Sequence, residues 1–348
     1  VLDLIKYVDS LNVLHGATKN ITNPTTQAVK DIERRAIGVG LKLLRSNVRH
    51  LGTEENIKIL QSIYEHMKPN ADFLFNKKVS NIIVENKEVK GITLSDGTSI
   101  YAKQVILGVG REGSDWLMDT LKVHKIPFKN NQVDIGVRVE TNDIVMEEIN
   151  EHLYEGKFIF NTSVGTSVRT FCSNPSGYVV IENHNGTVLC NGHAFSDRKL
   201  GSQNTNFALL VSHEFDEPFD DPNEFAQEVA KLANKLSGGS VIVQTYGDIL
   251  RGRRSTQKRL KESFVKPTLK EAVPGDLGLV LPYNTMKSLI EMTEALDHVT
   301  PGIASDHTLF YGVEAKFYSA KPQTNEYFET GIKNLYVGGD GAGITRGL

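Results

Sequence analysis

The stretch that decides the fold is residues 334–347, Asn-Leu-Tyr-Val-Gly-Gly-Asp-Gly-Ala-Gly-Ile-Thr-Arg-Gly. Its apolar, β-favouring residues 335–337 predict a short buried strand. The glycines after the strand let the backbone pass close to a ligand, and we expect a helix to begin just beyond them. The first turn of that helix would direct free N–H groups and a partial positive charge at the ligand. A strand that simply ends in a glycine-rich turn fits this stretch, taken alone, equally well. The residues that would line the site are Gly339, Asp340, Gly341, Ala342, Gly343, Ile344 and Thr345.

The composition is that of an ordinary globular protein long enough for two domains. The chain has 348 residues, 39% of them hydrophobic and 23% charged. A formal net charge of −3 gives no overall attraction to nucleic acid or to an anionic membrane. No run of apolar residues is long enough to predict a membrane span. The two cysteines, Cys172 and Cys190, cannot form a disulfide framework, so we expect a reducing, cytoplasmic setting.

Both ends of the chain suggest a piece of a longer protein. The chain begins at Val1 instead of a methionine, and it ends at Leu348, only a few residues into the helix expected after Asp340. We therefore expect a fragment of a longer polypeptide.

A second informative region, residues 79–113, predicts a β-meander that leads into another glycine stretch. Asp96-Gly97 is a strong hairpin signal between two of its strands. A fourth, apolar strand leads into Gly108-Val109-Gly110-Arg111-Glu112-Gly113, after which Ser114 would cap a helix over residues 115–121. The strands are expected at residues 79–84, 89–94, 98–102 and 104–107.

Residues 108–113 match the G-x-G-x-x-G pattern literally, but their context argues against the primary dinucleotide fingerprint. That fingerprint normally opens a βαβ unit, with an acid about twenty residues further on. Here a meander precedes the glycines, and the sequence after the helix does not form a clear βαβ unit.

The two glycine regions together resemble two motifs of the two-dinucleotide-binding flavoproteins, in the order in which that family carries them. In the family, the acid at the position of Asp340 hydrogen-bonds the ribityl chain of FAD, and the helix after it points at the flavin. The backbone at the position of Gly108 and Gly110 passes near the cofactor, and the residue at the position of Val79 contacts adenine through its backbone. A valine in a β-core explains Val79 equally simply. The family's first motif, G-x-G-x-x-G with an acid beyond it, is missing from this chain.

The region between the two motifs has a different pattern. Residues 132–140 alternate as a strand, helices are expected at 222–236 and 284–296, and further strands lie between them. The expected fold is mixed α/β. Residues 1–131 and 308–348 would form an incomplete FAD/NAD(P)-binding-type nucleotide domain, with residues 132–307 as an inserted β-rich substrate domain.

Much of the chain is also similar to a bacterial and archaeal group of FAD-dependent dehydrogenases of undefined substrate. Ser173 departs from this group, because a second cysteine often stands there. The resemblance implies an FAD fold with an interrupted nucleotide domain, but no substrate. It rests on residues 171–180, 191–198, 208–211 and 312–315.

Several side chains in the chain are candidates for chemistry. Cys172 would lie near the flavin and be redox-active, or it is a buried cysteine that acts as a small hydrophobe, which is the commoner case. Four arginines would hold an anionic substrate or form ion pairs, because an arginine within a strand needs a partner or a wet cavity. They are Arg45, Arg49, Arg138 and Arg169.

Two charged runs and the histidines give weaker signals. The basic run 251–261 would bind phosphate or nucleic acid, or it pairs with the acidic run 214–224 or is solvated. It lacks interleaved aromatic residues, which weakens a nucleic-acid interpretation. The ten histidines lack the companions of a metal-binding motif, so no metal site is predicted.

The favoured hypothesis is an FAD-dependent oxidoreductase, a dehydrogenase that acts on a small molecule. Its flavin would be re-oxidised by a nicotinamide, NAD(P), or by another acceptor. This chain would bind FAD weakly or not at all, because it lacks the first glycine motif. A non-catalytic binding module with vestigial flavin motifs is the main alternative, and a nucleic-acid-modifying flavoprotein is a third. The sequence predicts neither the catalytic residues nor the oligomeric state.

Overall fold

The computed structural model describes residues 2–343, except residues 50, 52, 111, 154, 185, 196 and 197. The chain divides into two compact units. Unit 1 comprises Val1–Lys19, Leu51–Asn131 and Tyr318–Leu348, and unit 2 comprises Asn20–His50 and Gln132–Phe317. Helices and strands occur in both units, so the predicted mixed α/β class is confirmed.

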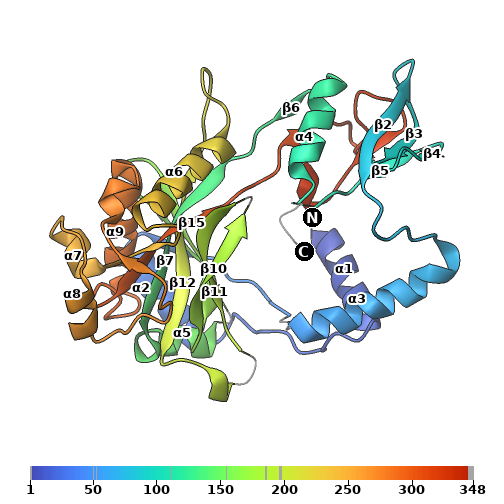
Figure 1. Cartoon of the computed structure of the whole chain (residues 1–348). Helices are drawn as coiled ribbons and strands as arrows, with labels where there is room; N and C mark the ends of the chain where they lie inside the picture. The colour runs from blue at the N-terminus through green and yellow to red at the C-terminus, as the bar shows by residue number, and fades with distance from the viewer. Residues whose placement is uncertain are drawn as a thin grey trace. The chain divides into compact units, whose positions relative to one another are not determined.

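Unit 2 is built on an eight-stranded sheet with the order β1-β8-β9-β12-β7-β15-β13-β14 (Figure 1). Neighbouring strands pair antiparallel, except β13 and β14, which are parallel. The strands are β1 Leu41–Leu43, β7 Val133–Asn142, β8 Phe158–Asn161, β9 Ser167–Asn174, β12 Asn204–His213, β13 Ile242–Thr245, β14 Val273–Pro274 and β15 Leu309–Lys316.

The helices of unit 2 begin at side chains that suit helix N-termini. Asn142 accepts a hydrogen bond from the N–H of Ile144, and Asp221 accepts one from Glu224 ahead of Pro222. The predicted helices 222–236 and 284–296 are confirmed. The helices are α2 Gln27–Gly38, α5 Asp143–His152, α6 Pro222–Leu236, α7 Tyr246–Leu250, α8 Gln257–Glu262 and α9 Tyr283–Asp297, with 3-10 turns η2 Arg198–Leu200 and η3 Leu277–Leu279.

The central strand β7 is buried on both faces. Its odd-numbered residues 133–139 are apolar and share one hydrophobic cluster with residues of α2, α5 and α9. Its even-numbered residues Asp134, Arg138 and Glu140 are polar, and they are also buried. The hairpin β10 Tyr178–His184 and β11 Thr187–His193 packs on this second face, where Cys190 clusters with Tyr311 of β15.

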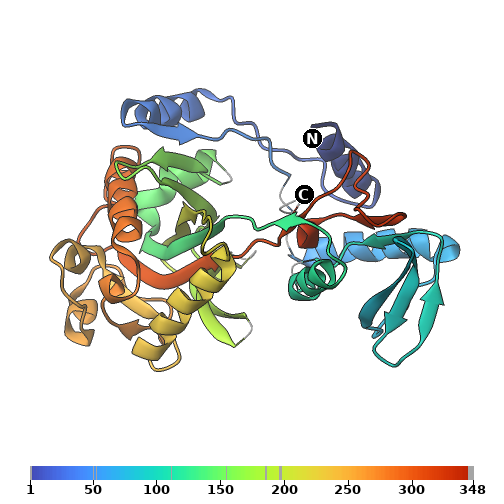
Figure 2. The ribbon, with the colours of Figure 1, turned by 90° about the horizontal axis from the view of Figure 1, so that it is seen from above.

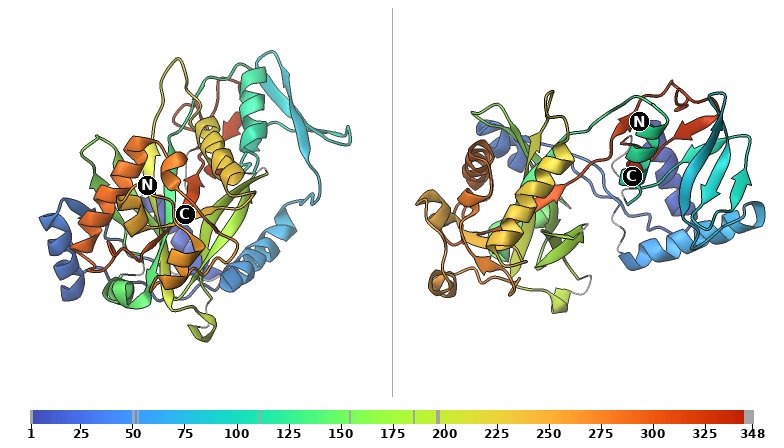
Figure 3. Two further views of the ribbon diagram at one scale, coloured as in Figure 1. Left: turned by 60° about the vertical axis from the view of Figure 1, so that its left-hand side comes forward. Right: turned by 45° about the horizontal axis from the view of Figure 1, so that its top comes forward.

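Unit 1 contains the predicted meander and a short parallel pair of strands. Strands β2 Val79–Glu85, β3 Glu88–Leu94 and β4 Ser99–Tyr101 form an antiparallel sheet, teal in Figure 2. Strand β5 Val105–Leu107 pairs parallel with β17 Leu335–Val337. β17, in red, lies beside the teal strands in the right-hand view of Figure 3. The remaining elements are α1 Leu2–Leu14, α3 Thr53–Met67, α4 Ser114–Val123, β6 Phe128–Lys129, β16 Lys321–Pro322 and the 3-10 turns η1 Lys68–Asn70 and η4 Asp340–Ala342.

The core of unit 1 is small. Leu117 and Leu121 of α4 pack with residues of β5 and β17 in one apolar cluster. Beside them Ile106, at the centre of β5, is 74% exposed, and none of the residues of α1 is buried. Parallel sheets normally have both faces covered, so unit 1 leaves more of its sheet open than a complete α/β domain does.

The units differ from the predicted domains at two places. Residues 20–50 belong to unit 2 because β1 pairs with β8, and residues 308–317 belong to it because β15 pairs with β7 and β13. The sequence alone gives no information about which strands pair with β15.

One predicted detail of local structure is wrong. Ser114 is the first residue of α4, and Gly113 occupies the cap position without a side-chain hydrogen bond. Helix α2 ends at Gly38, and Gly40 then turns the chain with a φ of +79°. None of the described helices has both the length and the apolar character needed to cross a bilayer.

Candidate functional site

The structure brings the two glycine stretches of unit 1 together. Strands β5 and β17 run parallel in register, with Leu335 opposite Val105 and Val337 opposite Leu107. The N–H of Gly338 donates to the carbonyl of Leu107 at 3.0 Å, so the pairing continues into the first glycine. Both glycine stretches therefore follow the carboxyl ends of adjacent parallel strands, which is where open α/β sheets bind their ligands.

Some of these glycines are required by the backbone itself. A Cβ on Gly341 would lie 2.2 Å from the carbonyl oxygen of Gly110, so the two segments touch through their main chains. Gly339 has φ of +76° and ψ of −166°, a conformation that is essentially restricted to glycine. A Cβ on Gly343 would lie 2.5 Å from Nδ2 of Asn131, which donates to the carbonyl of Ser319.

Other glycines at the same place face open space. A Cβ on Gly108, Gly110, Gly338 or Gly339 would meet no atom within 4 Å. At Gly108 and Gly338 the φ angle is not in the left-handed region either, so neither packing nor conformation demands glycine there. A ligand that approaches the backbone closely would explain both residues.

Asp340 lies at the centre of this arrangement. It is half-buried and begins η4, a 3-10 turn, while the helix expected beyond the glycines falls outside the described residues. The turn ends at Ala342, and Gly343 adopts a left-handed φ of +65°. Ile344 and Thr345, also predicted to bind the cofactor, lie outside the described residues.

Val79 is not part of this cluster. It begins β2 and pairs with Leu94 of β3, in the meander sheet and not in the β5–β17 pair. Its proposed contact with adenine remains a prediction.

The helix after the upstream glycines is poorly suited to hold a phosphate. The loop before α4 is filled by its own chain, since a Cβ on Gly113 would lie 2.6 Å from the Cβ of Val109. Asp115 in the first turn of α4 places negative charge where an anion would bind. Both observations support the sequence argument that residues 108–113 are not a primary phosphate-binding fingerprint.

Arg138 is a structural residue of unit 2, not a free substrate ligand. Its side chain is fully buried, and it donates to Oδ1 of Asn206 at 2.8 Å, to the carbonyl of Cys172 at 3.0 Å and to Glu314 at 3.3 Å. Gly192 of β11 leaves the room for this guanidinium, because a Cβ there would lie 1.9 Å from Nη2. Arg138 therefore forms an ion pair within unit 2, and not at a domain interface.

The other three candidate arginines also have partners in unit 2. Arg169 donates to Asp134 at 2.7 Å, and Arg45 pairs with Glu33 at 3.2 Å. Arg49 donates to the carbonyl of Asn20 at 3.4 Å. None of these contacts places an arginine in the glycine site of unit 1.

Glu140 is a buried carboxyl that sequence reasoning missed. It accepts hydrogen bonds from the hydroxyls of Tyr311 and Thr268, each at 2.5 Å, and from Nδ2 of Asn204 at 3.1 Å. Burial raises the pKa of Glu140 although these donors act to lower it, and burial beside Glu140 also raises the pKa of Tyr311. Charged residues at even positions of β7 were the available signal, but such a pattern usually marks a solvent face.

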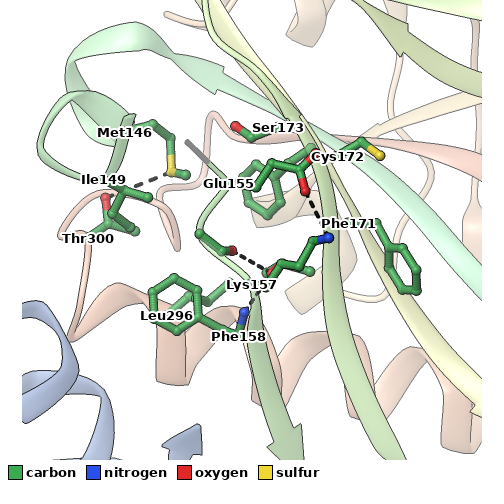
Figure 4. A pocket seen from close by; sticks show the side chains of 13 residues that line it. Met146, Ile149, Glu155, Lys157, Phe158, Phe171, Cys172, Ser173, Leu296 and Thr300 are labelled. Carbon is green, nitrogen blue, oxygen red and sulfur yellow. Dashed lines mark hydrogen bonds and ion pairs between the residues drawn. The ribbon is translucent and has the colours of Figure 1, made fainter. Parts of the chain in front are cut away.

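Cys172 lines a small pocket between α5, β8 and β9 (Figure 4). It is exposed, so the expectation of a buried cysteine is wrong, and its redox role stays a prediction. The pocket walls are largely apolar, with Met146 and Leu296 among them, and Lys157 pairs with Glu155 at 3.0 Å. The enclosed space holds about one water molecule, which is too little for a substrate.

The basic run 251–261 has acidic partners, but not the predicted ones. Arg251 pairs with Asp306, and Arg253 and Arg259 both pair with Asp248. These three arginines thus pair with carboxylates outside the acidic run 214–224. Within the described part of the chain, no group of three His, Cys, Asp or Glu side chains is arranged to hold a metal ion.

Residues 132–317 match the family model described as FAD-dependent protein, C-terminal domain-like. This region is more than half of the chain and coincides with the larger segment of unit 2. A comparison with the curated proteins found no match.

Three solved structures are similar to the chain at low identity. They are an oxidoreductase from Methanosarcina mazei (14% identity, 82% of this chain and 49% of that one, TM-score 0.29), PqsL, a probable FAD-dependent monooxygenase from Pseudomonas aeruginosa (13%, 94% and 69%, 0.31), and 2,6-dihydroxypyridine-3-hydroxylase from Arthrobacter nicotinovorans (13%, 82% and 53%, 0.30). The chain thus spans about half the length of two of these proteins. TM-scores near 0.3 are too low to assign a fold or an activity.

Proposed function

The chain belongs to the family of FAD-dependent proteins whose C-terminal domain-like model matches residues 132–317, and from this premise we propose that it serves an FAD-dependent oxidoreductase. The flavin supplies two-electron oxidation and reduction when it is bound. The substrate class that we propose is a small organic molecule, oxidised in a dehydrogenase reaction, with a nicotinamide as the second electron carrier.

The observation that carries this proposal is the meeting of two glycine stretches and one carboxylate at the ends of β5 and β17. Asp340 would accept hydrogen bonds from ribityl hydroxyls, and such charge-assisted bonds contribute about 1.5–3 kcal/mol each. Gly108 and Gly338 would let the ligand approach the main chain, because the space beside them is open. These residues fit the flavin and ribityl portion of FAD.

The diphosphate portion of FAD finds no comparable support in the described residues of unit 1. The turn before α4 is filled by Val109, and Asp115 opposes an anion there. We therefore assign the diphosphate to groups other than those of this turn. For this chain the proposal predicts weak binding that depends on the flavin end of the cofactor.

The exposure of Ile106 in unit 1 also supports a site that contacts the flavin end of FAD and not its diphosphate. Ile106 is 74% exposed on a parallel pair of strands, although parallel sheets are normally covered on both faces. A further strand or helix over this face would complete the nucleotide-binding domain and would place a phosphate-binding helix N-terminus near the glycines.

The direct test is riboflavin binding by the full chain and by Asp340→Asn, measured by quenching of flavin fluorescence. We expect the substitution to weaken binding about tenfold or more, because an amide does not offer two charged acceptors. Asp119→Asn is the matched control, since Asp119 is an exposed acid on α4 of the same unit. Equal affinities for the two variants would refute the assignment of Asp340.

The redox proposal has its own test. With flavin bound, NADH or NADPH added without oxygen should bleach the flavin absorbance if a nicotinamide is the second carrier. Bleaching by neither cofactor would contradict the nicotinamide part and would leave the Asp340 result unaffected.

A further inference from the structure

A hollow of about 260 Å³ at one end of the unit 2 sheet is lined by arginines that the proposed flavin site does not use. It lies where β13 ends and β15 begins, beside α7 and α8, which are labelled in Figure 1. The side chains that matter for its chemistry are Arg251, Arg253, Arg259, His307, Asp248 and Asp306.

A buried carboxylate fixes two of these arginines. Asp248 has a 2% exposed side chain, and its Oδ1 accepts from Nε of Arg253 at 2.6 Å. Its Oδ2 accepts from Nε of Arg259 at 2.8 Å and from the hydroxyl of Ser255 at 2.7 Å. Burial acts to raise the pKa of Asp248, but the bonds from Ser255, Arg259 and Arg253 outweigh it and the pKa is lowered. The carboxylate thus stays ionised and holds both guanidinium groups in place.

This mode of attachment leaves one arginine able to bind a second anion. The Arg253 side chain is 51% exposed although its Nε is tied to the buried carboxylate. Its guanidinium is therefore held through Nε, while about half of the side chain stays accessible to solvent. A guanidinium held in this way loses little conformational entropy when it binds a planar or tetrahedral oxyanion.

A third arginine and a histidine complete the wall. Arg251 donates to the carbonyl of Gly247 and to Asp306, both at 2.7 Å, and its side chain is half-exposed. His307 lies in the same wall, and its ring is tilted against that of Phe264 with 4.2 Å between centroids. The donors thus come from residues 251–259 and from His307.

The positive charge beyond that of the wall comes from neighbouring residues of the same run. Three carboxylates in the wall, Asp248, Glu262 and Asp306, balance the three arginines in number. However, residues 251–261 also contain Arg254, Lys258 and Lys261 and no acid. These cations raise the local potential and favour an anionic ligand.

We propose that this hollow binds a small molecule through a phosphate or diphosphate group. Fixed guanidinium groups match phosphate oxygens in geometry and charge, and the volume accommodates a phosphate with a small body attached. Residues 251–261 contain no aromatic side chain on which bases would stack, so a small molecule fits better than a single-stranded nucleic acid. The site is independent of the flavin proposal, because all its residues belong to unit 2.

The test is isothermal titration of the full chain with pyrophosphate and with AMP, each at low ionic strength. Arg253→Gln should weaken pyrophosphate binding about tenfold or more, because one fixed charge-assisted donor is lost. Lys258→Gln removes the same charge from an exposed position of α8 outside the wall, and it should change the affinity less than threefold. Arg251→Gln provides a second variant, half-exposed, should Arg253→Gln fail to fold.

The contrary results are equally clear. Absence of pyrophosphate and AMP binding at 10 mM ligand, or equal weakening by Lys258→Gln and Arg253→Gln, would overturn the proposal. A thymidine oligonucleotide that binds more tightly than pyrophosphate, with a steep salt dependence, would also overturn it in favour of an extended nucleic-acid surface. Tighter binding of AMP than of pyrophosphate would support a monophosphate, and the reverse a diphosphate.

Discussion

Units 1 and 2 both contain a sheet, but they bury that sheet to very different extents. In unit 2, β7 is buried along nearly its whole length, with apolar residues on one face and paired charges on the other. In unit 1, the central residue of β5 is 74% exposed, and the parallel sheet has two strands. Unit 2 thus covers its central strand with its own residues, whereas unit 1 leaves part of its two-stranded parallel sheet exposed.

The charged residues of the two units also differ in their surroundings. In unit 2, Arg138 and Glu314 are buried together as an ion pair. In unit 1, Asp340 lies half-buried among glycines, and several of these face open space. A buried, paired arginine has a structural role, whereas the role that we propose for Asp340 is contact with the flavin end of the cofactor.

The largest expected effect is on unit 2. Arg138→Ala would leave Glu314 buried without its arginine partner, and breaking such a pair costs about 3–5 kcal/mol of unfolding free energy. Hydrogen exchange of the β7 amides should report this loss. Trp116, the single tryptophan, lies on α4 of unit 1. The midpoint of the denaturant-induced transition that Trp116 fluorescence follows should not change if the units unfold separately.

The control for this prediction is Arg34→Ala, which removes an exposed pair with Asp31 and should cost less than about 1 kcal/mol. The Trp116 fluorescence transition could also lose as much unfolding free energy as the β7 amides lose in hydrogen exchange. That result would show that the two units unfold together, and it would contradict separate unfolding.

The second effect is on unit 1. Gly341→Ala would place a Cβ 2.2 Å from the carbonyl oxygen of Gly110 and should cost about 1–3 kcal/mol through the forced backbone shift. The denaturation midpoint of Trp116 fluorescence measures it. Gly108→Ala adds the same methyl group close to Gly110, but into open space. This variant should leave the unfolding free energy almost unchanged. Similar costs for both variants would show that the close approach of the two glycine stretches is not real.

The smallest effect is the pH dependence of unit 2. Burial lowers the pKa of His213, whose ring lies tilted against that of Phe225 with 5.9 Å between centroids, so the folded state favours the neutral histidine. The unfolded chain takes up the proton near pH 6.5, and stability therefore falls as the pH drops below that value toward the lowered pKa. The slope cannot exceed about 1.4 kcal/mol per pH unit for one proton.

His213→Gln should flatten this dependence in exchange measurements on β12, while His298→Gln, an exposed histidine, should leave it intact. An unchanged slope in His213→Gln would assign the acid sensitivity to other groups.

Local patterns predicted much of unit 1. Asp96-Gly97 and the alternation around it gave the meander, and the apolar residues 335–337 gave β17. These signals depend on neighbours in sequence, which is why they can be predicted. The helix expected beyond the glycines falls on residues that lie outside the described part of the chain.

The buried polar face of unit 2 was not predictable in the same way. Charges at positions 134, 138 and 140 suggest a solvent face, since alternation in a strand usually means one wet side. The residues that surround Arg138 on this face are Gly192, Asn206 and Glu314, and all three are distant from it in sequence. The same limit applies to Asp248, whose two arginine partners could not be distinguished from solvated cations.

The most direct test of the central claim is the ratio of riboflavin to FAD affinity for the unmodified chain. If residues 108–110 and 338–343 hold the flavin end of the cofactor and the diphosphate is held elsewhere, both ligands should bind weakly and with affinities within about threefold, because they share the groups that make contact. Stoichiometric binding of FAD with an affinity a hundredfold or more above that of riboflavin would contradict this claim. Such binding would require a diphosphate site among the described residues of unit 1.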